Sequence, residues 1–137
     1  MLTLLTLIAA AAAAPTCTST VSLADKAGKF TDGTDEKSLY DNDERRCWTI
    51  KPDCGEGGHV SVWFPRVDVE TGYDVVHVYT LGGTLLSKAV SQGGTFSGDG
   101  FVVAFSSDSS VTRTGFTAGY SCDVLPEEDT EPVEDER

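Results

Sequence analysis

Apolar and polar residues alternate along several short stretches of the chain. In residues 59–64, Val60, Val62 and Phe64 fall on one face, which is the two-residue period of a half-buried β-strand. Comparable stretches cover residues 47–51, 74–79, 101–105 and 115–120, with glycine-rich breaks between them. Residues 85–90 fit either a strand or a single helical turn. The pattern predicts an all-β fold, either a β-sandwich or a barrel.

The first 14 residues differ from the rest of the chain. Residues 2–14 are largely apolar and uncharged, but this run is shorter than the roughly 20 residues needed to span a bilayer. Ala11 and Ala13 have the A-x-A spacing that signal peptidase accepts. We therefore expect residues 1–14 to be a secretory signal peptide, cleaved near Ala13 or Ala14. The mature chain is then secreted and has no membrane anchor.

Length and charge restrict the function classes further. With 137 residues, the chain has room for one domain, which we place at residues 17–122. The net charge is −12, which disfavours binding to a nucleic-acid backbone. Residues 123–137 carry −7 of this charge and few apolar side chains, so we expect them to form a disordered acidic tail.

Four cysteines, Cys17, Cys47, Cys54 and Cys122, lie in the chain. None of their spacings is C-x-x-C, which argues against a zinc cluster or a thioredoxin-type redox pair. We expect structural disulfides, as in many small secreted domains. Three pairings are compatible with the sequence alone.

Signals for catalysis are weak. The sequence contains no G-x-S-x-G or H-E-x-x-H motif that would place a nucleophile or a catalytic metal. The two histidines, His59 and His77, alternate with valines in expected strands. We therefore expect a protein that is not an enzyme.

Several segments, taken in order, resemble a CUB domain. They are residues 28–33 (GKFTDG), Tyr40 followed by 47–50 (CWTI), 62–64 (VWF), 69–70 (VE), 72–79 (GYDVVHVY), 103–110 (VAFSSDSS) and 115–120 (GFTAGY). The resemblance covers about residues 17–122. It implies a two-sheet antiparallel β-sandwich with jelly-roll type topology, which is extracellular and serves binding.

The resemblance also bears on the disulfides. It implies a bond between Cys17 and Cys47, because the first family cysteine pairs with the one before the W-x-I strand. The usual second bond begins just before the Tyr-Asp pair, where this chain has Gly72. Cys54 and Cys122 then either pair with each other, as we expect, or stay free.

A calcium site is implied by the same resemblance. In calcium-binding CUB domains, three carboxylates coordinate Ca²⁺ and a tyrosine orients the glutamate. The matching residues here are Glu70, Asp74 and Asp108 as ligands, Ser109 through its carbonyl and Ser110 through its hydroxyl as further oxygens, and Tyr40 as the orienting residue. Ca²⁺ takes six to eight oxygen ligands, so water would complete the shell.

Three function hypotheses follow. The favoured one is a secreted module that binds an extracellular protein in a calcium-dependent manner, with the site capturing a lysine or arginine of that partner. The first alternative is a carbohydrate- or surface-binding CUB protein of the spermadhesin type, in which exposed aromatic side chains carry recognition. The second is a structural matrix component whose acidic tail collects cations.

Overall fold

The computed structural model describes residues 15–32 and 39–123. The expected signal peptide, residues 1–14, and the acidic tail beyond Asp123 lie outside the described residues. Within the described ranges the chain forms strands and turns without a helix. No helix there is long and apolar enough to cross a membrane.

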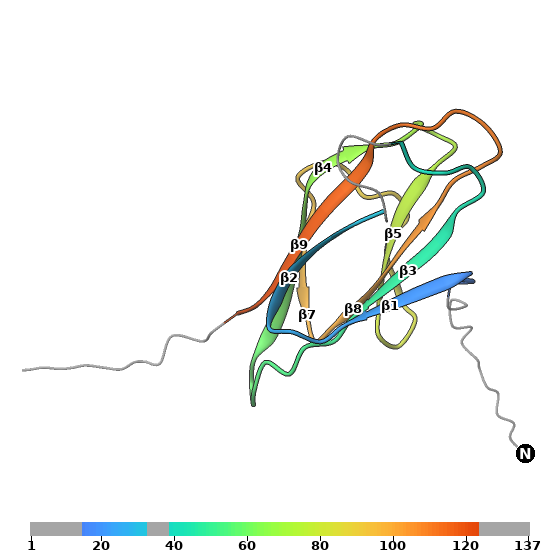
Figure 1. Cartoon of the computed structure of the whole chain (residues 1–137). Coiled ribbons are helices and arrows are strands. Elements are labelled where there is room, and N and C mark those ends of the chain that lie inside the picture. Colours follow the sequence, from blue (N-terminus) through green and yellow to red (C-terminus); the bar gives the residue numbers. More distant parts are fainter. Residues whose placement is uncertain (1–14, 33–38, 124–137) are drawn as a thin grey trace, which may run out of the picture.

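Two sheets pack face to face (Figure 1). One has five strands in the order β1-β3-β8-β5-β6, and the other has four in the order β2-β9-β4-β7. The strands are β1 (Ser19–Leu23), β2 (Ala27–Thr31), β3 (Arg45–Ile50), β4 (His59–Asp68), β5 (Val75–Thr80), β6 (Leu85–Ser87), β7 (Thr95–Gly98), β8 (Phe101–Ser106) and β9 (Gly115–Asp123). The expected all-β sandwich is confirmed.

Strand directions differ from the expectation at one edge. All pairs are antiparallel except β1 and β3, which run parallel. The chain places β2 in the opposite sheet between these two strands, so it returns to the first sheet in its original direction. The ambiguous stretch at residues 85–90 contains a short strand, β6.

An aromatic cluster fills the space between the sheets. Phe116 of β9 lies at its centre, with ring centroids 5.3 Å from Trp48 and 5.9 Å from Phe105. Val60, Val62 and Phe64 are fully buried, as their alternation predicts. Aromatic pairs at such distances add stabilisation beyond the burial of their area. Phe105 also contacts the ring of Tyr40 at 4.8 Å, which links the core to the loops beyond β8.

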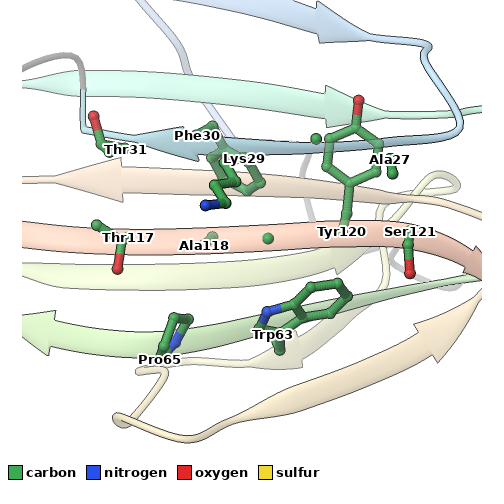
Figure 2. Close-up of a pocket in the computed structure, with 12 residues that line it drawn as sticks. Ala27, Lys29, Phe30, Thr31, Trp63, Pro65, Thr117, Ala118, Tyr120 and Ser121 are labelled. Carbon is green, nitrogen blue, oxygen red and sulfur yellow. The ribbon is translucent and has the colours of Figure 1, made fainter.

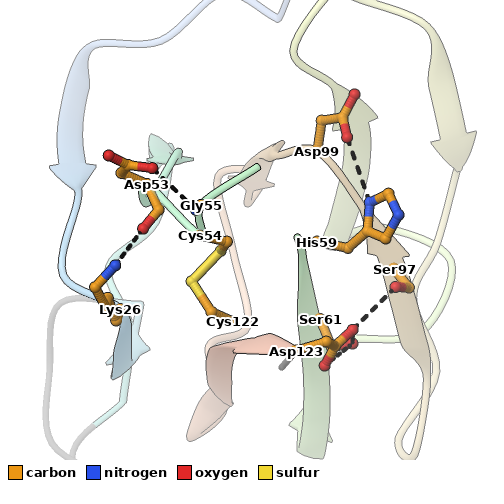
Figure 3. The surroundings of a disulfide bond; sticks show 10 residues. All are labelled: Lys26, Asp53, Cys54, Gly55, His59, Ser61, Ser97, Asp99, Cys122 and Asp123. Atoms are coloured by element: carbon orange, nitrogen blue, oxygen red, sulfur yellow. Dashed lines mark hydrogen bonds and ion pairs between the residues drawn. A yellow bond between two sulfur atoms is a disulfide. The ribbon is translucent and has the colours of Figure 1, made fainter. Parts of the chain in front are cut away.

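Two disulfides join the expected pairs, Cys17 with Cys47 and Cys54 with Cys122. The first ties the segment before β1 to β3 within one sheet. The second joins the loop after β3 to β9, and so connects the two sheets (Figure 3). No described cysteine is free. Such bonds are typical of proteins in oxidising compartments.

Candidate functional site

The loops that carry the expected site residues meet at one end of the sandwich. They follow β4, precede β3 and follow β8, and they gather at the upper end of the view in Figure 1. The Cys54–Cys122 disulfide lies at the opposite end, because β3 runs away from the site and ends just before Cys54. We call these the loop end and the disulfide end.

A tight turn brings Glu70 and Asp74 together. The main-chain N–H groups of Tyr73 and Asp74 donate to the Glu70 carbonyl, at 3.1 and 2.9 Å. Gly72 adopts a φ of 88°, which glycine tolerates because it has no Cβ. The turn therefore joins β4 of the four-stranded sheet to β5 of the five-stranded sheet and places one carboxylate at each of its ends.

Asp74 is the centre of the hydrogen-bond network, with only 1% of its surface exposed. One carboxylate oxygen, Oδ2, accepts a hydrogen bond from the Tyr40 hydroxyl. The other, Oδ1, accepts one from the main-chain N–H of Asp108 at 2.9 Å. Buried carboxylates need such partners, because burying an unpaired charge costs several kcal/mol. Asp74 thus fixes the loop after β8 against the turn after β4.

Asp108 begins the loop after β8. Its carbonyl accepts a hydrogen bond from the N–H of Asp43 at 2.8 Å, which fixes the loop from the other side. Its side-chain Oδ1 accepts from the N–H of Ser110 at 3.2 Å. Ser109 and Ser110 are exposed beside it. They lie where further oxygen ligands are expected, and their role in coordination stays a prediction.

The three carboxylates converge on one point. Glu70, Asp74 and Asp108 each offer an oxygen, and these oxygens lie within 4.8 Å of one another. Oxygens around one Ca²⁺ lie at about 2.3–2.6 Å from the ion, so two of them can be up to about 5 Å apart. The spacing fits a single Ca²⁺ ion. In the described part of the chain, this is the one group of acidic, histidine or cysteine side chains with such spacing.

Glu70 shows that this cluster is electrostatically costly without a cation. Its Oε1 atom is buried and has no hydrogen-bond partner. Burial, together with the charges of Asp108 and Asp74, raises the pKa of the Glu70 carboxyl. Like charges this close disfavour ionisation. A divalent cation would relieve both the repulsion and the missing contact, so the donor set fits a hard, oxygen-preferring ion.

Tyr40 contacts both Asp74 and Glu70 through its hydroxyl. The expectation is a tyrosine that orients the glutamate side chain. In the structure the Tyr40 hydroxyl donates to Asp74 and accepts from the main-chain N–H of Glu70 at 3.2 Å. Burial and the bond to Asp74 raise the pKa of Tyr40, so its hydroxyl keeps its proton. Tyr40 therefore positions the Asp74 carboxylate and the Glu70 backbone.

Asp68 lies nearby but belongs to a separate contact that sequence reasoning missed. Its carboxylate accepts hydrogen bonds from the Arg113 guanidinium at 2.7 Å and from the N–H of Thr114 at 3.2 Å. Hydrogen bonds from Thr114 and Arg113 lower the pKa of Asp68 to about 2. The partners are separated by 45 residues in sequence, and no local motif connects them.

A second concave region lies on the outer face of the four-stranded sheet. The cavity has a volume of about 490 Å³ and is lined by residues of β2, β4 and β9. Figure 2 shows Trp63 and Pro65 of β4 beside Thr117 and Ser121 of β9, with Lys29 of β2 across from them. A Cβ on Gly119 would lie 2.8 Å from the Trp63 indole. Glycine at this position therefore lets the indole lie close against β9. We call this region the Trp63 groove.

Comparison with known proteins agrees with the fold. No protein-family model matches the sequence, and no curated protein matches it. Among solved structures, the full extracellular region of zebrafish Gpr126/Adgrg6 aligns with a TM-score of 0.67 and 28% identity, over 77% of this chain and 15% of that one.

Two further similar structures contain CUB domains. The MASP-1 CUB2 domain, in a crystal structure bound to Ca²⁺, aligns with a TM-score of 0.62 and 19% identity, over 74% of this chain and 96% of that one. The CUB1-EGF-CUB2 domains of rat MASP-1 align with a TM-score of 0.64 and 24% identity, over 82% of this chain and 47% of that one. This chain therefore spans less than half of the rat and zebrafish proteins. From the strand order and these similarities, we conclude that the chain has the CUB-domain fold.

Proposed function

We propose that this chain is a secreted, non-enzymatic CUB module that binds Ca²⁺ through Glu70, Asp74 and Asp108. The occupied site then captures a lysine or arginine side chain of an extracellular partner protein. The observation that carries this proposal is the convergence of three carboxylate oxygens within 4.8 Å. Among the described residues, no lysine or arginine forms an ion pair with any of the three.

The charge balance favours a basic partner. Three carboxylates exceed the charge of one Ca²⁺ by one unit, so the occupied site would still attract a cation. The ion would also hold the carboxylates in place before a partner arrives, which lowers the ordering cost of association. The MASP-1 CUB2 domain, which has the same fold, has been solved bound to Ca²⁺, and this similarity supports calcium as the ion. Ser109, Ser110 and water would supply further oxygens.

Calcium titration of the refolded domain tests the proposal. At ten times a dissociation constant of about 10⁻⁴ to 10⁻³ M, binding would stabilise the fold by about 1.4 kcal/mol. We expect thermal unfolding to shift upward with Ca²⁺ in the wild type and to stay unchanged in Asp108→Ala. Asp99→Ala is a matched control, because Asp99 is an exposed acid near His59 at the disulfide end. An equal shift in wild type and Asp108→Ala would reject the site.

Truncation distinguishes this site from the acidic tail. A chain that ends after Leu125 lacks most of the tail charge but keeps the three carboxylates. We expect its calcium-dependent shift to equal that of the full chain. Loss of the shift on truncation would instead favour the matrix-component hypothesis, in which the tail collects cations.

The Trp63 groove favours carbohydrate binding as a second candidate function. Trp63 is 37% exposed, and hydroxyl-bearing side chains, Thr117 and Ser121, line the same cavity. A flat aromatic surface with hydroxyls around it suits a sugar ring, which presents C–H groups on one face and hydroxyls at its edge. Quenching of Trp63 fluorescence by a panel of monosaccharides in chelator tests this function. Because Trp63→Ala removes the indole that reports quenching, ligand-observed NMR with the same sugars measures this variant. We expect Trp63→Ala to lose sugar binding, and retained binding would reject the Trp63 groove.

A further inference from the structure

The three most exposed large apolar side chains in the described part of the chain all lie at the loop end. Leu39 is 54% exposed, Tyr73 is 67% exposed and Val111 is 54% exposed. Every other exposed large apolar side chain there has an exposed fraction of 45% or less. Single exposed apolar residues are ordinary on protein surfaces, whereas a group of them around a polar site is typical of interfaces.

Hydrogen bonds hold the loops with these side chains against one another. Leu39 directly precedes Tyr40, whose N–H donates to the Arg113 carbonyl at 3.0 Å, two residues beyond Val111. Tyr73 directly precedes Asp74, which accepts from the Tyr40 hydroxyl and from the N–H of Asp108. The three apolar side chains therefore lie on the loops that carry the carboxylate cluster. We call them the apolar rim.

Val111 also has an unusual backbone conformation. Its φ is 61°, in the left-handed region that β-branched residues rarely adopt. Such a conformation is unfavourable for a valine. The loop thus keeps an exposed apolar side chain at a position where asparagine or glycine would fit the backbone better. Neither the exposure nor the conformation contributes to packing of the core.

We propose that the apolar rim is part of the partner-binding surface, and that the partner presents a lysine or arginine flanked by apolar residues on an extended segment. This inference rests on the proposed function, because the basic side chain enters the calcium-loaded carboxylate cluster. Charge complementarity places that side chain at the centre. The apolar rim then contacts the flanking residues and excludes water from the central charge pair, an arrangement typical of binding hot spots.

Two short peptides probe the surface in the presence of Ca²⁺. Both are blocked pentapeptides with a central lysine, which is flanked by leucines in one and by glycines in the other. Chemical-shift titration of the full-length protein by two-dimensional NMR measures the two dissociation constants, even when binding is weak. We expect the leucine-flanked peptide to bind about ten-fold more tightly, and we expect this preference to vanish in chelator together with binding.

Variants of the apolar rim test whether its residues cause the tighter binding of the leucine-flanked peptide. Tyr73→Ser and Val111→Asn each remove an exposed apolar group, and asparagine suits the positive φ at position 111. We expect each to reduce the preference for leucine several-fold while the glycine-flanked peptide binds as before. Leu86→Ser is the matched control, because Leu86 is 45% exposed on β6, outside the loop end. It should leave the preference unchanged.

Each result separates this inference from the proposed function. Equal binding of the two peptides in wild type would overturn the apolar rim and leave capture of a basic side chain intact. A preference that survives both rim variants would also overturn it. Absence of binding by either peptide in Ca²⁺ would overturn the proposed function, and the inference with it.

Discussion

The two ends of the sandwich both carry acidic residues, but they arrange them differently. At the disulfide end, three acids make separate polar contacts. Asp53 accepts from the N–H of Gly55, Asp99 pairs with His59, and Asp123 accepts from Ser61 and Ser97 (Figure 3). At the loop end, three carboxylates converge on one point. Convergence, and not the number of acids, therefore distinguishes a candidate cation site from an ordinary acidic surface.

The two ends also hold the sheets together by different means. The Cys54–Cys122 bond connects the sheets covalently at the disulfide end. At the loop end, the chain itself crosses between the sheets in the turn from β4 to β5, and hydrogen bonds around Asp74 and, as we propose, a bound ion hold the loops together. This contrast leads to three predictions in which one end changes and the other does not.

The largest effect is expected from removing the Cys54–Cys122 bond. The two cysteines are separated by 68 residues, and closing a loop of that length stabilises a fold by about 4 kcal/mol in the chain-entropy model. We expect Cys54→Ser with Cys122→Ser to lower the free energy of unfolding by about that amount. The additional stabilisation by Ca²⁺ should stay the same, because the loop end is intact.

Denaturant unfolding with and without Ca²⁺ measures both quantities in the same samples. The matched control is Cys17→Ser with Cys47→Ser, which removes the bond within one sheet. In the contrary outcome, the additional stabilisation by Ca²⁺ disappears only in the variant that lacks Cys54 and Cys122. That result would show that the two ends are coupled and do not stabilise the sandwich independently.

A smaller effect is expected from Tyr40→Phe. This change keeps the ring against Phe105 but removes the hydroxyl that donates to Asp74 and accepts from the N–H of Glu70. Loss of these bonds next to a buried carboxylate should cost about 1–3 kcal/mol. We also expect weaker calcium binding, because the Asp74 carboxylate loses its positioning contact. Calorimetric titration checks the affinity, and unchanged affinity would show that Tyr40 serves stability alone.

The smallest effect concerns Asp68 and acid stability. Contacts with Thr114 and Arg113 lower the pKa of Asp68 from 3.8 to about 2. A lowered folded-state pKa means that the stabilisation is complete above about pH 4 and is lost as the pH falls through 2. Because the carboxylate is about a third exposed, solvent screening limits the effect to less than about 1 kcal/mol.

Replacing Asp68 by asparagine tests this assignment. The free energy of unfolding of Asp68→Asn should change less between pH 4 and pH 2 than that of the wild type. Asp99→Asn is the control for loss of an acid at the disulfide end. Identical pH profiles for Asp68→Asn and wild type would show that the Asp68 contacts contribute nothing to acid stability.

The sequence predicted the central strands because their side chains alternate strictly. Val60, Val62 and Phe64 have a period that only a half-buried strand satisfies. The strand at Thr95–Gly98 was missed, since only Phe96 in it is large and apolar and glycines surround it. The parallel pairing of the first strand was also missed. It depends on the path of the chain between the two sheets, which alternation does not encode.

For the candidate site, the residues were predictable but their contacts were not. The resemblance placed Glu70, Asp74 and Asp108 in one site, and the turn between the first two follows from Gly72. The donation from Tyr40 to Asp74 spans 34 residues, and sequence spacing gives no hint of it. The exposed side chains around the site were missed as well, because exposure depends on which neighbours cover a residue in three dimensions.

The covalent link at the disulfide end has a dynamic consequence. Because the Cys54–Cys122 bond adds a cross-link there, we expect the sheets to separate transiently more often at the loop end. Amide hydrogens near the start of β5 and the end of β8 should then exchange with deuterium faster than those near the end of β3. A cation that bridges Glu70 and Asp74 would slow exchange selectively at the loop end. Calcium would then reversibly suppress local opening of the domain at that end.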